Sequence, residues 1–132
     1  ELVPNFKMST ALARSLQPES VPHNDAVFNV SRSALLIASL TQSPEFLMAA
    51  TEDKLHQDYR AAAMPETHAL VQLMREHGHA AVVSGAGPSV LVLATGPAQR
   101  LEAAAIAAKH YPQWKALLLA VDFKGATVVT HQ

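Results

Sequence analysis

Two short apolar runs joined by a glycine-rich loop constrain the fold of this chain more than any other feature. The runs cover residues 80–83 and 90–94, contain β-branched residues and are bounded by turn residues, so each predicts a buried β-strand. The loop between them reads Ser-Gly-Ala-Gly-Pro-Ser, and its glycines at positions 85 and 87 permit positive φ angles and close approach of another group. The pattern predicts a hairpin whose loop is either an ordinary turn or a surface of backbone N–H groups for an anion or a neighbouring loop.

Composition excludes several classes of protein. The 132 residues suit one domain, and 49% hydrophobic with 16% charged residues is enough to form a core. The net charge of −1 and the scattered Lys and Arg residues provide no basic face, so we expect no nucleic-acid partner. The chain has no cysteine, which fits a reducing compartment, and we expect a cytoplasmic protein. No apolar stretch approaches the roughly 20 residues that span a bilayer, so no membrane partner is expected either.

Capping signals and helix-spaced apolar residues predict the remaining elements. A short helix begins after Ser9 or Thr10 and extends to Leu16, and Gly78 ends the helix that begins at residues 64–65. Further helices are expected over about 24–40, from 43 onward, over 52–57 towards Arg60, and over about 97–110. Further strands are expected over 2–3, 114–121 and 126–130, with a turn at 122–125.

The predicted order reduces to β-α-β-β-α-β with extra helices inserted in the first crossover. This order is typical of a ferredoxin-like α+β fold, in which helices cover one face of an antiparallel sheet. Many unrelated functions use that architecture, so the fold by itself assigns none. The chain lacks an initiator methionine, and Leu2-Val3 before Pro4 has the composition of the end of a strand. We therefore expect the chain to be one domain of a longer protein.

Few polar residues form a pattern that indicates chemistry. The seven histidines lack a spacing that would bring three or four ligands together, so we expect no metal site. Arg14 and Arg60 each carry a planar guanidinium that binds carboxylates, although spacing alone favours a solvated or ion-paired surface arginine at each position. The glycine loop lacks the Lys-Ser/Thr of a nucleotide-binding P-loop and precedes a strand. Without further information, the residues indicate only an α+β domain with an unusual loop.

Four segments, in order along nearly the whole chain, resemble the homoserine kinases of the GHMP superfamily, which also includes galactokinase, mevalonate and phosphomevalonate kinases. Residues 9–18 resemble the family's S-T-x-x-A-R…P stretch, and residues 21–32 are similar to its long-helix motif. Residues 53–65 resemble the D-x-L-H-Q-P-Y-R…P stretch, except that Asp58 stands where the family often has proline. Residues 78–94 resemble the superfamily's third glycine-rich motif.

The resemblance implies transfer of the γ-phosphoryl group of ATP to the hydroxyl of L-homoserine, a step of threonine biosynthesis that uses Mg²⁺. The family's main ATP loop, a P-x-x-x-G-L-G-S-S motif, belongs to an N-terminal domain that these 132 residues do not contain. ATP and Mg²⁺ are therefore expected to bind mainly to that domain. This chain would be the C-terminal, substrate-side domain, and it is expected to be inactive by itself.

The resemblance also implies which residues form the site. Arg14 and Arg60 would bind the homoserine carboxylate, because two guanidinium groups there select amino acids over simple alcohols. Four further residues would border the cleft, namely Thr10, His23, Asp25 and Asn29. One wall of the phosphate site would come from the loop of Ser84, Gly85, Ala86, Gly87, Pro88 and Ser89. No catalytic residue and no metal ligand is assigned to this chain.

Two alternatives remain open at the level of sequence. The parent could be another GHMP kinase, acting for example on a mevalonate-type acid. The chain could instead be a non-catalytic ferredoxin-like module that binds an amino acid or pairs with a second copy of itself. The sequence also leaves open whether a homodimer forms.

Overall fold

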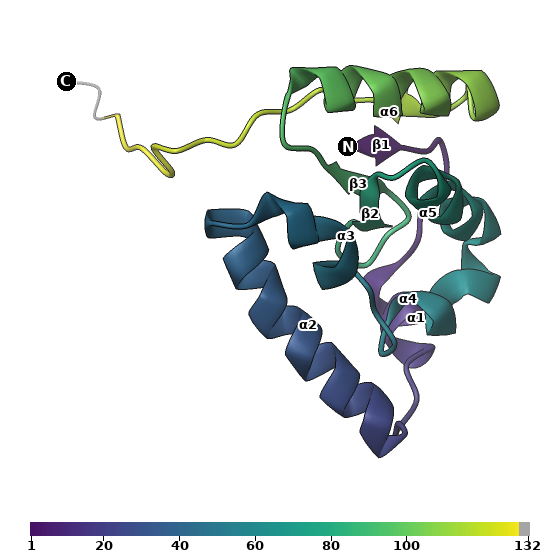
Figure 1. Cartoon of the computed structure of the whole chain (residues 1–132). Helices are drawn as coiled ribbons and strands as arrows, with labels where there is room; N and C mark the ends of the chain where they lie inside the picture. Colours follow the sequence, from purple (N-terminus) through teal and green to yellow (C-terminus); the bar gives the residue numbers. More distant parts are fainter. Residues whose placement is uncertain (130–132) are drawn as a thin grey trace.

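The computed structural model describes residues 1–129 and combines a four-stranded antiparallel sheet with helices (Figure 1). The strands are β1 (Leu2–Val3), β2 (Ala80–Val83), β3 (Val90–Leu93) and β4 (Lys115–Ala116), in the order β2-β3-β1-β4. The α-helices are α1 (Thr10–Ser15), α2 (His23–Thr41), α3 (Leu47–Ala50), α4 (Gln57–Arg60), α5 (Pro65–Glu76) and α6 (Pro97–His110). Short 3-10 helices cover Pro44–Phe46 and Ala61–Ala63. The prediction of an α+β fold with an antiparallel sheet is confirmed.

The core lies between one face of the sheet and helices α5 and α6. Side chains alternate along a strand, so β2 and β3 direct every second residue towards this core. The buried cluster consists of Leu2, Leu70, Val71, Met74, Ala81, Val90, Ala103, Ala107 and Trp114. Trp114 completes one end, where its ring meets Phe6 and Tyr111 edge to face at centroid distances of 6.0 and 5.9 Å. The cluster as a whole packs α5 and α6 against the sheet.

The predicted hairpin is present, and its loop is tied to α5. Ala80 pairs with Leu93 and Val83 with Val90 in an antiparallel register. The N–H of Ser84 donates to the carbonyl of Ser89 at 2.8 Å, and Gly87 N–H donates to the Ser84 carbonyl at 2.9 Å. Gly85 and Gly87 have φ angles of 57° and 83°, the left-handed region that glycine adopts without strain. Buried Thr67 of α5 donates its hydroxyl to the Pro88 carbonyl at 2.8 Å, which fixes the base of the loop.

Local capping signals correctly predicted several helix ends. Ser9 is the N-cap of α1, and its hydroxyl accepts from the N–H of Leu12 at 3.0 Å. Gly78 follows α5 with a φ of 81°, as expected of a glycine that ends a helix. Pro97 occupies the first position of α6, where its missing N–H leaves no bond unmade. These ends depend on residues close in sequence, which explains why the sequence sufficed.

Three predicted elements are wrong or shorter than expected. Residues 52–56 form turns, and helix α4 begins only at Gln57, because a side-chain carboxylate binds the backbone amides that a longer helix would use. The strand expected over 114–121 is limited to β4, because β1 pairs with it only through Leu2 and Val3. Residues 126–129 form no strand, and residue 130 of that predicted strand lies outside the described residues.

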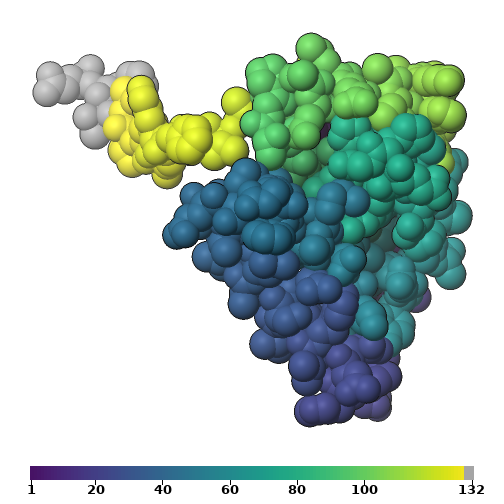
Figure 2. Space-filling view, viewed as in Figure 1, coloured from purple at the N-terminus to yellow at the C-terminus, as the bar shows by residue number. Residues whose placement is uncertain are grey.

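Helix α2 leaves much of its apolar side in solvent. Val27, Val30, Ile37 and Leu40 are between 54% and 71% exposed. Figure 2 shows the first part of α2 as a tapering extension of the molecule, away from the packed body around α6. Between α2 and the sheet face opposite the core lies a cavity of about 420 Å³, lined in part by Leu36, Val82 and Leu91. Among the described helices, none has both the length and the apolar character required to cross a membrane.

The two loop glycines should differ in their sensitivity to a methyl group. A Cβ on Gly87 would lie 2.7 Å from the Met64 sulfur and 3.1 Å from a Val83 methyl, whereas a Cβ on Gly85 would meet nothing within 4 Å. Met64 is 1% exposed and has little room to move. We expect Gly85→Ala to lower the free energy of unfolding by about 1 kcal/mol, from the left-handed backbone alone. Gly87→Ala should lower it by roughly 2–4 kcal/mol, since overpacking adds to the same strain. Urea unfolding of both variants measures the difference, and equal losses would contradict the packing argument.

Candidate functional site

A cavity of about 300 Å³ brings together three segments that are distant in sequence. Its lining comes from α1, from the turn that leads into α4, and from the glycine loop. The lining residues are Thr10, Ala13, Arg14, Gln17, His56, Arg60, Gly85 and Ala86. Both arginines singled out in the sequence therefore reach one cavity, and no Asp or Glu belongs to its lining.

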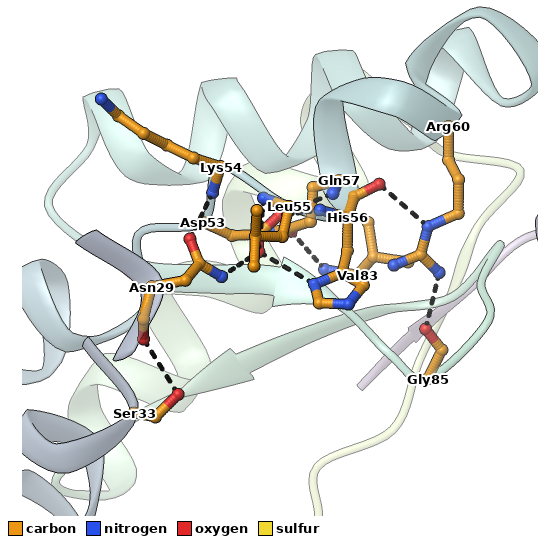
Figure 3. A network of polar contacts seen from close by, with 10 residues as sticks. All are labelled: Asn29, Ser33, Asp53, Lys54, Leu55, His56, Gln57, Arg60, Val83 and Gly85. Carbon is orange, nitrogen blue, oxygen red and sulfur yellow. Dashed lines mark hydrogen bonds and ion pairs between the residues drawn. The ribbon is translucent and has the colours of Figure 1, made fainter. Parts of the chain in front are cut away.

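Arg60 is the buried member of the pair. It is 8% exposed, its Nε donates to the His56 carbonyl at 3.1 Å, and its Nη1 donates to the Gly85 carbonyl at 3.0 Å (Figure 3). Within residues 1–129, no carboxylate lies within ion-pair distance of this guanidinium. A buried charge without an opposite charge is costly, and the two carbonyls offset only part of that cost. An anion in the cavity would complete its coordination.

Arg14 is the exposed member, on the short helix that Ser9 caps. Its side chain forms no ion pair within residues 1–129. Two guanidinium groups therefore line one cavity from different elements. That of Arg60 is held by two hydrogen bonds, whereas that of Arg14 is exposed. A guanidinium binds carboxylate or phosphate oxygens through parallel N–H···O bonds, so the cavity suits a small anion.

Asp53 organises the turn before α4, and both of its carboxylate oxygens bind groups of the protein. Oδ2 accepts from the N–H groups of His56 at 2.8 Å and Gln57 at 2.7 Å (Figure 3). Oδ1 accepts from Asn29 Nδ2 at 2.8 Å and from the N–H of Leu55 at 3.2 Å, and it lies 3.1 Å from the His56 ring Nδ1. The carboxylate thus fixes the turn that leads into α4 and links it to α2.

These contacts determine the protonation of Asp53. Burial of the carboxyl group raises its pKa. Hydrogen bonds from the Gln57 backbone, the Asn29 side chain, and the His56 backbone and ring together lower the pKa by more than burial raises it. The net result is a pKa of about 2, below the ordinary value of 3.8. Asp53 is therefore ionised throughout the neutral range.

The other three predicted cleft residues do not line the Arg14–Arg60 cavity, although Asn29 lines the 420 Å³ cavity beside α2, which Arg60 also lines. Asn29 uses its amide within the protein, since Nδ2 donates to Asp53 and Oδ1 accepts from the N–H of Lys54 at 2.8 Å. Asp25 lies 3.4 Å from the Lys54 ammonium, and His23 is an exposed residue at the start of α2. Of the six residues predicted to contact substrate, the structure brings Thr10, Arg14 and Arg60 together and leaves these three outside.

The residues of the glycine loop also divide into some that line the Arg14–Arg60 cavity and others that do not. Gly85 and Ala86 line the cavity, whereas Ser84 and Ser89 close the hairpin through their backbones. Gly87 faces Met64, and the Pro88 carbonyl is bound by Thr67. The tip of the loop is therefore the part that an anion in the cavity could meet.

Sequence reasoning gave no role to Asp53 or Gln57. Gln57 Oε1 accepts from the N–H of Val83 at 2.8 Å, so it ties α4 to the strand that precedes the loop. The N-cap position of α4 is His56, whose side chain makes no capping bond, and Asp53 lies three residues earlier. No local cap signal therefore marked Asp53, and its partner Asn29 is distant in sequence. Among residues 1–129, no three His, Asp or Glu side chains gather closely enough to hold a metal ion.

Comparison with known proteins identifies the relatives of this chain. The family described as GHMP kinases C terminal matches residues 32–113. The homoserine kinases of Clavibacter michiganensis subsp. michiganensis and Leifsonia xyli subsp. xyli are 73% and 70% identical over 128 residues. Each match covers 96% of this chain and 40% of the relative, so the chain spans about 40% of the length of the curated relatives it matches.

A solved structure is similar in fold. The crystal structure of homoserine kinase from Cytophaga hutchinsonii superposes with a TM-score of 0.72 over 84% of this chain and 36% of that one. At 18% sequence identity, this likeness concerns the fold alone.

Because the pKa of Asp53 is lowered, the free energy of unfolding should depend on pH in the acidic range. Because its folded pKa is about 2 against an ordinary 3.8, its contribution is complete above pH 3.8 and is lost as the pH falls through 2. We expect Asp53→Asn to lower the free energy of unfolding by about 2 kcal/mol at pH 7. The difference from the unmodified chain should shrink as the pH falls from 4 towards 2. Urea unfolding at stepped pH measures it, and a difference that stays constant over this range would contradict the assignment.

Proposed function

The chain belongs to the GHMP kinases, whose C-terminal family matches most of its length, and we propose that it is the substrate-side domain of a homoserine kinase. The proposed reaction transfers the γ-phosphoryl group of ATP to the hydroxyl of L-homoserine. The names of relatives at 70% identity and above support this substrate. The observation that carries the proposal is a cavity that Arg14 and Arg60 both line and that has no acidic residue in its lining.

The two guanidinium groups suit the carboxylate of an amino acid. Arg60 already uses Nε and Nη1 on backbone carbonyls, which leaves its remaining N–H groups for a ligand. Arg14 would contribute a second fork from α1. A substrate without a carboxylate would leave both charges uncompensated, and this difference favours an amino acid over a simple alcohol. Thr10, at the start of α1, lines the same cavity and offers a hydroxyl.

We propose that the tip of the glycine loop borders the phosphate groups. Within residues 1–129, the N–H groups of Gly85 and Ala86 form no backbone hydrogen bond, and both residues line the cavity. Two adjacent free N–H groups can donate to an anionic oxygen. Phosphoryl transfer depends mainly on positioning and charge neutralisation, and this chain would contribute the substrate's position.

ATP would bind mainly to an N-terminal domain carrying the family's glycine- and serine-rich loop. Mg²⁺ would bind there with it, because this ion usually binds the phosphate groups of its substrate together with one or two carboxylates. We further assign the domain to the ferredoxin-like class, with extra helices in the first crossover. The strand order β2-β3-β1-β4 and the placement of α1 to α5 between β1 and β2 support this assignment.

Arginine substitutions in the full-length protein test the carboxylate assignment. We expect Arg60→Ala and Arg14→Ala each to raise KM for L-homoserine by roughly 10- to 100-fold, since a charge-assisted bond contributes about 1.5–3 kcal/mol. KM for ATP should rise by a much smaller factor, because most nucleotide contacts would come from the N-terminal domain. Steady-state kinetics measures both constants. Arg14 is exposed, so its variant remains informative if loss of buried Arg60 impairs folding.

The matched control is Arg100→Ala. This arginine donates to the Leu119 carbonyl at 2.6 Å and does not line the Arg14–Arg60 cavity. Its loss should leave both constants unchanged. An unaltered KM for homoserine in the Arg14 and Arg60 variants, or an equal rise in both constants, would remove the carboxylate assignment.

The division of labour between two domains gives a second test. The 132-residue chain alone should phosphorylate no homoserine, whereas the full-length protein should phosphorylate it in preference to mevalonate. Coupled measurement of ADP release with a panel of acceptor alcohols distinguishes these outcomes. Turnover by the chain alone would refute the proposed division, and preference for mevalonate would replace the proposed substrate.

A further inference from the structure

We propose that Asp53 is a positioning residue for Arg60, because it holds the turn of residues 53–57 in the conformation that presents both backbone acceptors to the guanidinium. This inference rests on the proposed function, since it concerns how the carboxylate site is assembled. It assigns a role to a side chain outside the Arg14–Arg60 cavity.

The first step is the hold of Asp53 on the turn. Its side chain is 13% exposed, and its two oxygens accept from three consecutive backbone N–H groups, those of Leu55, His56 and Gln57. Gln57 is the first residue of α4, and amides at the start of a helix have no partner within that helix. The carboxylate supplies a partner for this amide and for the two that precede it, so the path of the chain into α4 depends on it.

The second step leads from the turn to the guanidinium. The carbonyl of His56, whose N–H binds Asp53, accepts from Arg60 Nε at 3.1 Å. Gln57, whose N–H also binds Asp53, uses its side chain to bind Val83, the last residue of β2. The loop that follows β2 supplies the Gly85 carbonyl to Arg60 Nη1 at 3.0 Å. Both acceptors of Arg60 are therefore tied to the turn that Asp53 orders (Figure 3).

The third step is the anchor on α2. Asn29 donates to Asp53 through Nδ2 and accepts from the Lys54 N–H through Oδ1, so one amide binds two successive residues of the turn. Helix α2 thus determines where the turn lies without lining the Arg14–Arg60 cavity. The role of Asn29 in this arrangement is to support Asp53.

Asp53 does not line the cavity that would hold the substrate, and its oxygens are all engaged with protein groups. It therefore has no free acceptor for a substrate proton. Its influence on the reaction passes through Arg60. Small displacements of a substrate-binding group strongly reduce rates. Loss of the hydrogen bonds from Asp53 to the turn should therefore lower the preference for substrates that carry a carboxylate.

The test is Asp53→Asn in the full-length protein. Asparagine has nearly the same shape as aspartate. Its NH₂ group would replace one carboxylate oxygen and would face N–H donors, with which it forms no hydrogen bond. We expect the preference in kcat/KM for L-homoserine over 3-amino-1-propanol, which lacks the carboxylate, to fall by roughly 10- to 100-fold. KM for ATP should rise by a much smaller factor than KM for L-homoserine. The pH profile of kcat between about 6 and 9 should keep its shape, because Asp53 is not the proton acceptor.

Glu52→Gln is the matched control. The neighbouring Glu52 carboxylate pairs with Arg32 at 2.9 Å and makes no contact with Arg60, so its variant should keep the preference of the unmodified protein. If Asp53→Asn impairs folding, Asn29→Ser removes the Nδ2 donor while retaining the carboxylate, and the preference should fall in the same direction by a smaller factor. An unchanged preference in the folded variants, with both substrates slowed equally, would show a merely structural role and overturn the proposal.

A second measurement does not depend on turnover. In the full-length protein, hydrogen exchange of the Arg60 Nε–H, followed by ¹⁵N NMR, should accelerate at least about tenfold in Asp53→Asn and remain unchanged in Glu52→Gln. Unchanged exchange in Asp53→Asn would overturn the positioning role. If the unmodified protein fails to phosphorylate homoserine, the proposed function fails, and the exchange measurement still decides whether Asp53 holds Arg60.

Discussion

A buried arginine without a carboxylate partner is the constraint on which the described structure depends. Arg60 is held by two backbone carbonyls, one from the turn before α4 and one from the glycine loop. Carbonyl oxygens stabilise a guanidinium without neutralising it, so the positive charge remains available to a ligand. A surface ion pair would have removed that charge at little structural cost. The surrounding elements instead keep it unpaired and fixed, as expected of a group that binds an anion.

The buried carboxylate of Asp53 is arranged in the opposite way, since its oxygens are all engaged in hydrogen bonds. Asp53 lies close in sequence to Arg60, yet the two do not pair, because the carboxylate is fully used by backbone and amide donors. A direct ion pair would neutralise both groups and leave no uncompensated positive charge for an anion in the cavity. The separation therefore divides the work between a charge that organises the backbone and a charge that remains free to bind. Asn29 extends the same organisation to α2.

The hydrophobic core secures the glycine loop from one face of the sheet, whereas large apolar side chains near the opposite face are exposed. Helices α5 and α6 cover one sheet face, and Thr67 and Met64 secure the glycine loop from the α5 side. On the opposite face, α2 borders a cavity and exposes several large apolar residues.

The sequence by itself determined the elements whose signals lie within a few residues. The hairpin of residues 80–93, the Ser9 cap, the Gly78 helix end and the Pro97 helix start all follow from such signals, as does the resemblance to the GHMP kinases. Tertiary structure decided where residues 52–56 turn, how short β4 is, and which predicted site residues meet. Those outcomes depend on partners from elsewhere in the chain: Asn29 for Asp53, β1 for β4, and the glycine loop for Arg60. Local preferences cannot specify them, because the free energy of each contact exists only once distant segments have packed together.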